Sequence, residues 1–313
     1  MSKVGHVFHP QYLLHDTGPG HPERADRLRA IESMLEQSQL IEKLERISIR
    51  PATFEEIALV HDPKHINRVA RTAESSGDYL DGDTYACPES YQAALLAAGG
   101  LLSAVEQVID GAVDRAFAMV RPPGHHAERT HAMGFCLFNN VGVAAEYLIK
   151  THGFKRVAIV DYDVHHGNAS QHMFYDRPDI FYASTHRYPF YPGTGAAEET
   201  GQGAGAGYTL NIPMGGGCGD EEYQKVFEEE LIPALREYRP DFLLVSAGFD
   251  AHRLDPLGGM AVSNQGFAWM SEQLEKIAQE FCGGKVVYTL EGGYDLEGLA
   301  GSVQKVMEVL LEQ

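Results

Sequence analysis

The sequence predicts a single α/β domain over residues 1–313, with a central, mostly parallel sheet covered by helices on both faces. Short apolar runs at 116–120, 157–160, 242–245 and 286–290 have the length and continuity of strands that are buried on both sides. Segments with helical periodicity lie between these runs, and no repeat or linker divides the chain. Strands that alternate with helices are typical of a parallel sheet between two helical layers.

The other elements are expected in the following order. Helices are predicted at 23–35, where Leu28, Ile31 and Leu35 share one face, and at 89–109, 141–150, 221–237 and 267–280. Gly99 and Gly100 interrupt the second of these helices, which indicates close packing of this helix. The glycine-rich stretch 201–207 does not match a dinucleotide-binding motif, so we expect a loop that leads into a strand at 208–212.

Composition excludes several classes of protein. The 44 Asp and Glu residues outnumber the 25 Lys and Arg residues and give a net charge of −19, so direct binding to nucleic acid is not expected. No segment approaches the ~18 apolar residues that a membrane span requires, and the first residues do not resemble a signal peptide. The four cysteines form no Cys-x-x-Cys pair, which favours a reducing, cytoplasmic location.

Polar residues follow each of the four apolar strands, where parallel sheets place their functional groups. Asp163 and His165 are two residues apart after one strand, and Asp250 follows another. An extended chain points the first two side chains the same way, and Asp250 could complete a site with three protein ligands. Such a site leaves a position open for water, which suits hydrolysis at Zn²⁺, although Fe²⁺ also suits these ligands.

The loops also carry groups that can move protons. A metal-bound water needs a base and a tetrahedral intermediate needs a hydrogen-bond donor, and His125, His126 and Tyr294 match these roles. Asp161 and Asn168 are the expected partners of the two imidazoles. A carboxylate partner would keep one imidazole protonated, whereas a neutral amide would leave the other nearer to its ordinary pKa.

These residues resemble the histone deacetylase family, which consists of zinc-dependent hydrolases with the arginase/deacetylase fold. The motifs occur in family order along nearly the whole chain: Arg121-Pro-Pro-Gly-His-His-Ala, Gly134-Phe-Cys, Asp161-x-Asp-x-His-His-Gly, Tyr191-Pro-Gly-Thr-Gly, Ser246-Ala-Gly-Phe-Asp-Ala and Glu291-Gly-Gly-Tyr. His21-Pro-Glu, Asn168 and Asp255-Pro-Leu-Gly-Gly resemble the class II subgroup and its bacterial relatives.

The resemblance implies a role for each matching residue. Asp163, His165 and Asp250 would bind Zn²⁺, with His126 as general base, His125 paired with Asp161, and Tyr294 polarising the carbonyl group. Asp161 and Ser184 would contribute to a K⁺ or Na⁺ site. The substrate would contact Gly134, the aromatic walls Phe135 and Tyr191, and Asp83 at the rim, and Arg27 would line an internal channel below the metal. Tyr191 replaces the usual Phe, which puts strict selectivity for acetyl groups in doubt.

The leading hypothesis is an enzyme that removes acetyl groups from acetylated protein, peptide or small amine substrates. Related alternatives are an acetylpolyamine amidohydrolase and an acetoin-utilisation-type deacetylase. Polyamine-selective relatives tend to place acidic residues at the rim, where this chain has Leu257. An arginase-like ureohydrolase would need a second metal and further carboxylates, and a non-catalytic acyl-lysine binding module would not need Tyr294 and both histidines. The sequence leaves the oligomeric state open.

Overall fold

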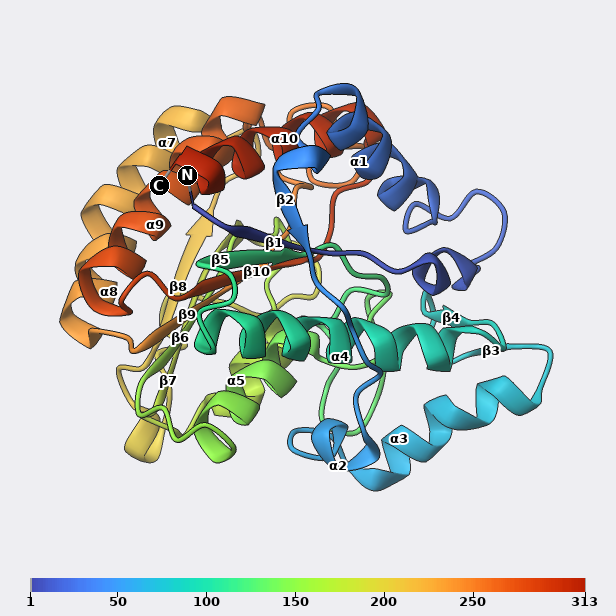
Figure 1. Ribbon diagram of the computed structural model, residues 1–313. Helices are drawn as coiled ribbons and strands as arrows, with labels where there is room; N and C mark the ends of the chain where they lie inside the picture. The colour runs from blue at the N-terminus through green and yellow to red at the C-terminus, as the bar shows by residue number, and fades with distance from the viewer. Residues whose placement is uncertain (1, 313) are drawn as a thin grey trace.

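The structure, a computed structural model, describes residues 2–312. Within them, eight parallel strands form one sheet in the order β2-β1-β5-β10-β9-β6-β7-β8 (Figure 1). The strands are β1 (Val4–Val7), β2 (Leu44–Arg46), β5 (Arg115–Ala118), β6 (Val157–Asp161), β7 (Ile180–Arg187), β8 (Thr209–Met214), β9 (Phe242–Ala247) and β10 (Val286–Leu290). The predicted fold class is therefore confirmed, with every pairing in this sheet parallel.

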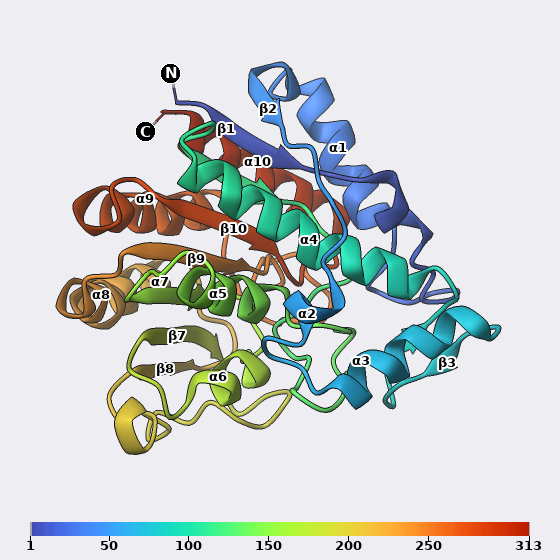
Figure 2. The same cartoon turned by 60° about the horizontal axis from the view of Figure 1, so that its bottom comes forward.

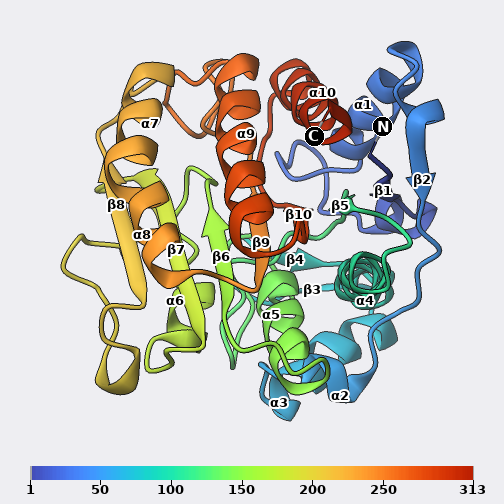
Figure 3. The ribbon, with the colours of Figure 1, turned by 60° about the vertical axis from the view of Figure 1, so that its left-hand side comes forward.

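Helices cover both faces of the sheet, and Figure 3 shows the strands side by side between them. One layer holds α1 (Asp26–Gln37), α10 (Leu296–Glu312), α9 (Asn264–Phe281), α7 (Asp220–Val226) and α8 (Ile232–Tyr238). The opposite layer holds α4 (Ser90–Ile109), α5 (Asn140–Lys150) and α6 (Asn168–Phe174). Beyond this layer lie α2 (Phe54–Ile57), α3 (Pro63–Ala70) and the hairpin of β3 (Asp78–Tyr79) and β4 (Tyr85–Ala86) (Figure 2).

All five predicted strands and all five predicted helices correspond to observed elements, with shifted ends. The strand expected at 116–120 ends at Ala118, and the helix expected at 23–35 begins only at Asp26. The sequence reading missed β1, β2, β7, the β3–β4 hairpin, α2, α3, α6 and α10. Strand β7 shows one reason. It contains Ser184, Thr185 and His186, so its burial on both faces is not visible as an apolar run.

The single helix expected at 221–237 is divided in the structure. A π-helical turn, Phe227–Leu231, separates α7 from α8. Pro233 lies at the start of α8 and has no N–H to donate to the preceding turn. The backbone instead closes a wider turn, in which the Ile232 N–H donates to the carbonyl of Phe227.

Helix α4 corrects the expectation that no segment is long and apolar enough to span a membrane. The 20 residues of α4 meet that criterion by length and composition, and 72% of the apolar window is buried inside the protein. The helix packs between the sheet and a crossing chain segment, and the Ala52 N–H donates to the carbonyl of Leu95 at 2.8 Å. An alanine methyl group at Gly99 would overlap the backbone of Arg50–Ala52, so the predicted close packing is present.

Strand order brings the functional loops together. The four strands with polar residues at their ends, β5, β10, β9 and β6, are neighbours in the middle of the sheet. Because all of them are parallel, their carboxyl ends open at the same edge. This edge holds the site described below.

Candidate active site

Asp163, His165 and Asp250 converge as the sequence predicted. The Nδ1 atom of His165 lies 3.1 Å from a carboxylate oxygen of Asp163 and 3.1 Å from one of Asp250. Among residues 2–312, these three form the group of His, Cys, Asp or Glu side chains whose ligand atoms lie close enough to hold one metal ion, within 4.8 Å of one another. All three side chains are largely buried.

The surrounding backbone contacts both carboxylates closely. The Gly292 N–H donates to Asp163 at 2.8 Å, and the Val164 N–H donates to Asp250 at 2.8 Å, so in each case one carboxylate oxygen remains directed at His165. A side chain at Gly248 or Gly292 would overlap these carboxylates. Two buried carboxylates and an imidazole on rigid turns form a ligand set that fits a divalent metal ion.

The two adjacent histidines, His125 and His126, have pKa values shifted in opposite directions. His125 Nδ1 lies 3.0 Å from the Asp161 carboxylate, and His126 Nδ1 lies 2.7 Å from the Asn168 amide oxygen. Burial alone would lower the pKa of His125, but the carboxylates of Asp161 and Asp163 outweigh it and raise the pKa to about 10. Burial and the charge of His125 lower the pKa of His126 well below its ordinary value. His126 is thus the neutral imidazole of the pair.

A narrow pocket of about 100 Å³ leads from the surface to these groups. Its lining consists of Asp83, His126, Gly134, Phe135, His165, Tyr191, Leu257 and Tyr294. The structure therefore brings every residue predicted to contact substrate to one cavity. The Tyr191 ring contacts His126 and the Phe135 ring contacts Tyr294, with ring centroids 5.3 Å and 5.9 Å apart. Asp83 and Leu257 are exposed, as expected for the rim, and the predicted wall residue Tyr191 is exposed as well.

Two predicted residues have contacts that the sequence did not suggest. Ser184 pairs with Asp161 across β6 and β7, and its hydroxyl lies 2.9 Å from His186 Nδ1. Arg27, which the resemblance places in an internal channel below the metal, lies outside the lining of the substrate pocket. It is fully buried, donates to the carbonyl oxygens of Glu291 and Gly293, and its guanidinium lies 5.2 Å from the ring centroid of Tyr294. Arg27 therefore holds the turn that carries Tyr294.

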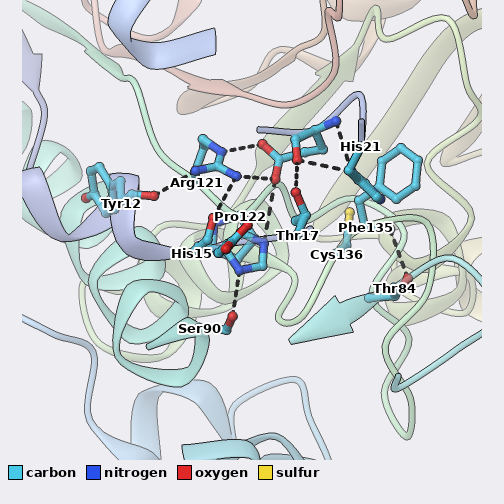
Figure 4. A network of polar contacts seen from close by, with 12 residues as sticks. Tyr12, His15, Thr17, His21, Thr84, Ser90, Arg121, Pro122, Phe135 and Cys136 are labelled. Carbon is cyan, nitrogen blue, oxygen red and sulfur yellow. Dashed lines mark hydrogen bonds and ion pairs between the residues drawn. The ribbon is translucent and has the colours of Figure 1, made fainter. Parts of the chain in front are cut away.

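A buried ion network supports this side of the site and was missed from the sequence (Figure 4). Arg121 donates to the carboxylate of Glu23 and to the carbonyl oxygens of Tyr12 and His15, at 2.8 Å and 3.1 Å for the latter two. Glu23 also accepts from Arg27 at 3.0 Å. The Glu23 carboxylate thus joins the loop after β5 to the segment before α1. The motifs that contain Arg121 and Glu23 were recognised, but nothing local indicates that these two charges meet.

Two further carboxylates hold the loops in place. Glu291 accepts from the backbone N–H groups of Gly124 and His125 at 2.6 Å and 3.2 Å, and so ties the turn after β10 to the histidine loop. Asp255 accepts from the Tyr294 N–H at 2.7 Å. The first residue of Glu-Gly-Gly-Tyr could have suggested the role of Glu291, because a buried acidic residue at a strand end needs donors.

Comparisons with known proteins identify the family of the chain. Residues 21–310 match the family model of the histone deacetylase domain. The chain is 41% identical to chloroplastic histone deacetylase 10 of Oryza sativa over 324 aligned residues, which cover 96% of this chain and 73% of that protein. It is 40% identical to a probable deacetylase of Archaeoglobus fulgidus, with 94% of this chain and 82% of that protein covered.

Among solved structures, the crystal structure of the HDA15 HD domain matches with a TM-score of 0.95 and 42% identity, covering 100% of this chain and 89% of that one. The likeness thus extends over the whole sheet and its helical layers. Because the family model matches most of the chain and the relatives are named as deacetylases, the chain belongs to the histone deacetylase family and is a hydrolase that acts on amide bonds.

Proposed function

We propose that this enzyme is a zinc-dependent deacetylase that hydrolyses N-acetyl-lysine side chains to the free amine and acetate. The observation that carries the proposal is the narrow pocket that ends at His126, His165 and Tyr294 beside the Asp163 and Asp250 carboxylates. A linear alkyl chain fits a narrow, aromatic-lined cavity, and the reacting amide would then stand among a base, a phenol and the predicted metal ligands.

The chain's own residues divide the chemistry. Asp163, His165 and Asp250 would hold the zinc ion, which would supply polarisation of the amide carbonyl and a lowered pKa of water. His126, which is neutral, accepts the proton of the attacking water and returns it to the departing amine nitrogen. Burial and the Asp250 and Asp163 carboxylates raise the pKa of Tyr294 well above its ordinary value, so its phenol stays protonated and can donate to the developing oxyanion.

The rim supports acetyl-lysine over acetylated polyamines. Leu257 is apolar and exposed at the mouth of the pocket, where it offers no charge to a polyamine. Asp83 can accept a hydrogen bond from a peptide backbone, and its carboxylate accepts from Thr84, whose hydroxyl accepts from the Phe135 N–H. Thr84 thus connects Asp83 at the rim to Phe135 in the aromatic wall by hydrogen bonds. The Tyr191 hydroxyl adds a polar atom to the pocket, which can change the preference for the length of the acyl group. The preferred acyl group is therefore tested together with the substrate class.

The test is a kinetic panel with acetyl-lysine, longer acyl-lysine and acetylated polyamine substrates. We expect the highest kcat/KM for an acetyl-lysine peptide, loss of turnover with a chelator, and recovery with Zn²⁺. Recovery with Fe²⁺ at a higher kcat than with Zn²⁺ would replace zinc in the proposal. A preference for acetylated polyamines would replace the substrate.

Removal of Asp250 tests the metal site directly. We expect Asp250→Ala to bind far less than one zinc ion per chain, because the remaining two ligands lie on a single loop. Elemental analysis of the purified variant measures the bound metal, and Asp255→Asn serves as a control for loss of a nearby carboxylate. Full zinc stoichiometry in Asp250→Ala would contradict the assignment.

Three further features are proposed for the native protein. A K⁺ or Na⁺ ion near Asp161 and Ser184 is supported by the pairing of these residues across β6 and β7. Titration of kcat with KCl at constant ionic strength tests it. A cytoplasmic location is supported by the four cysteines, which are all free thiols. The net charge of −19 favours acetylated proteins or amines over nucleic acid as partners.

A further inference from the structure

As a general base, His126 needs its ring hydrogen on a particular nitrogen, and its direct partner Asn168 cannot by itself determine which nitrogen that is. His126 Nδ1 faces the Asn168 side chain at 2.7 Å, so a base that acts on substrate must use Nε2, and the ring hydrogen must sit on Nδ1. A carboxylate partner would enforce this because it only accepts hydrogen bonds. An amide has an accepting end and a donating end, and the flipped amide would place the hydrogen on Nε2 instead.

The environment of the amide nitrogen removes this ambiguity. Asn168 Nδ2 lies 2.6 Å from a carboxylate oxygen of Glu128 and 3.5 Å from the sulfur of Met133. Both atoms are acceptors, so the NH₂ end of the amide must face them. The amide oxygen therefore faces His126, and the imidazole must donate to it from Nδ1.

We propose that Glu128 is a positioning residue for the general base: its carboxylate fixes the orientation of the Asn168 amide, and thereby leaves His126 Nε2 free of hydrogen at the substrate pocket. This rests on the proposed function, in which His126 is the base. Glu128 does not line the substrate pocket and acts only through Asn168. Glu128 is thus the third residue in a chain of hydrogen bonds that begins at His126 and continues through Asn168.

The backbone and side chain of Glu128 have separate tasks. Its N–H donates to the carbonyl of His131 at 2.9 Å, and its carbonyl contacts His61 Nδ1 at 3.0 Å. These contacts already hold the loop. Among residues 2–312, the polar contacts of the carboxylate are with Asn168 and the half-exposed His172, which lies 2.7 Å from the same carboxylate oxygen. Both Glu128 and His172 line a surface cavity of about 400 Å³ that is separate from the substrate pocket.

Kinetics of four variants test the proposal. We expect Glu128→Ala to lower kcat by about 10-fold to 100-fold with little change in KM, the usual effect of losing such an outer partner. Glu128→Gln should retain more of kcat, since its amide oxygen can still accept from Asn168. In Asn168→Asp, the new carboxylate accepts from His126 without help and would be repelled by Glu128. Adding Glu128→Ala to Asn168→Asp should therefore leave kcat equal or raise it.

A spectroscopic measurement tests the tautomer without relying on turnover. In ¹⁵N-labelled protein, the His126 signals, identified by their loss in His126→Gln, should show hydrogen on Nδ1 in the wild type. In Glu128→Ala they should show the Nε2–H form or a mixture. Because this readout needs no substrate, it can succeed even if the enzyme prefers another substrate than acetyl-lysine. An unchanged Nδ1–H signal in Glu128→Ala would overturn the proposal.

Glu56→Ala is the matched control. The Glu56 side chain is 15% exposed and that of Glu128 is 14% exposed. The Glu56 carboxylate accepts three hydrogen bonds, from Arg50 and the Thr53 N–H, and that of Glu128 has two polar contacts. Glu56 lies in α2, away from the site, so its loss should lower the melting temperature without changing kcat or the His126 signals. An equal kcat loss from Glu128→Ala in the wild-type and Asn168→Asp backgrounds would show that Glu128 supports only the loop.

Discussion

The adjacent imidazoles of His125 and His126 differ in protonation because their hydrogen-bond partners differ. His125 faces the Asp161 carboxylate and His126 faces the Asn168 amide, and the pKa shifts of the two imidazoles run in opposite directions. Tyr294 stands apart from this pair. Its backbone N–H is held by Asp255 and its ring packs against Arg27 and Phe135, so the turn and the packing together place its phenol.

Tyr294→Phe tests the role of that phenol. An oxyanion donor contributes mainly in the transition state, so we expect kcat to fall by about 10²–10³-fold while KM changes far less. The ring contacts with Arg27 and Phe135 remain in the variant, so the melting temperature should change little. Steady-state kinetics and thermal unfolding on one preparation distinguish the roles. Preserved kcat with a lower melting temperature would assign Tyr294 to packing.

Helix α4 and the segment 50–52 cross in direct backbone contact. Gly99 lies against the backbone of this segment, whose Ala52 N–H is bonded to the carbonyl of Leu95. A flexible side chain could move aside, but a hydrogen-bonded backbone cannot without losing its partner. Glycine is thus required here for close approach, despite its cost inside a helix.

Gly99→Ala should therefore destabilise the protein. Helix propensity alone would favour alanine by about 1 kcal/mol, but overpacking against backbone typically costs about 1–3 kcal/mol, and the broken Ala52 hydrogen bond adds to this. Chemical denaturation should show a lower midpoint than the wild type. The exposed Gln92 on the same helix provides the control, since Gln92→Ala should leave the midpoint nearly unchanged.

For the whole molecule, buried neutral histidines make stability depend on pH. His61 is buried between the Asn139 N–H, which donates to its Nε2 atom at 2.8 Å, and the Glu128 carbonyl, which lies 3.0 Å from its Nδ1 atom. The ring therefore has no nitrogen free to take a second proton. Burial, with a smaller effect from the charge of His65, lowers the pKa of His61 to about 3. Burial likewise lowers the pKa values of His15 and His186 to about 4.

The sign of the resulting pH dependence follows from linkage. In the unfolded chain these histidines bind a proton near pH 6.5, whereas in the folded protein they stay neutral to about pH 3–4. The unfolded state therefore binds more protons below pH 6.5, and the free energy of unfolding should fall by up to about 1.4 kcal/mol per pH unit for each such histidine as the pH decreases. Above pH 6.5 these histidines are neutral in both states, so they cause no loss in the free energy of unfolding.

Denaturation midpoints at pH 8, 6.5 and 5 measure this loss. His61→Gln should flatten the decline between pH 6.5 and 5, since its amide can keep both hydrogen bonds but does not titrate. The same change at the exposed His152 should leave the decline as steep as in the wild type. If His61→Gln and the wild type decline equally, another group controls acid unfolding.

Local sequence patterns were enough to predict the class of fold and the residues at the strand ends. Apolar runs of strand length identified β5, β6, β9 and β10, because strands buried on both faces have no polar side to mask them. The motif residues Asp163, His165 and Asp250 could be named because ligand type and spacing are local properties. Polar strands such as β7, and short elements such as α6, carry no such local signal.

The side chains that support the site are brought together by long-range contacts in the folded chain. The order β5-β10-β9-β6 places the four loops at one edge, and this order depends on contacts between segments far apart in the chain. The partnership of Glu23 with Arg121 spans 98 residues, and that of Glu128 with Asn168 spans 40. Such pairs form because buried charges and amides must find partners wherever the packed chain brings them, and no local sequence pattern records where that is.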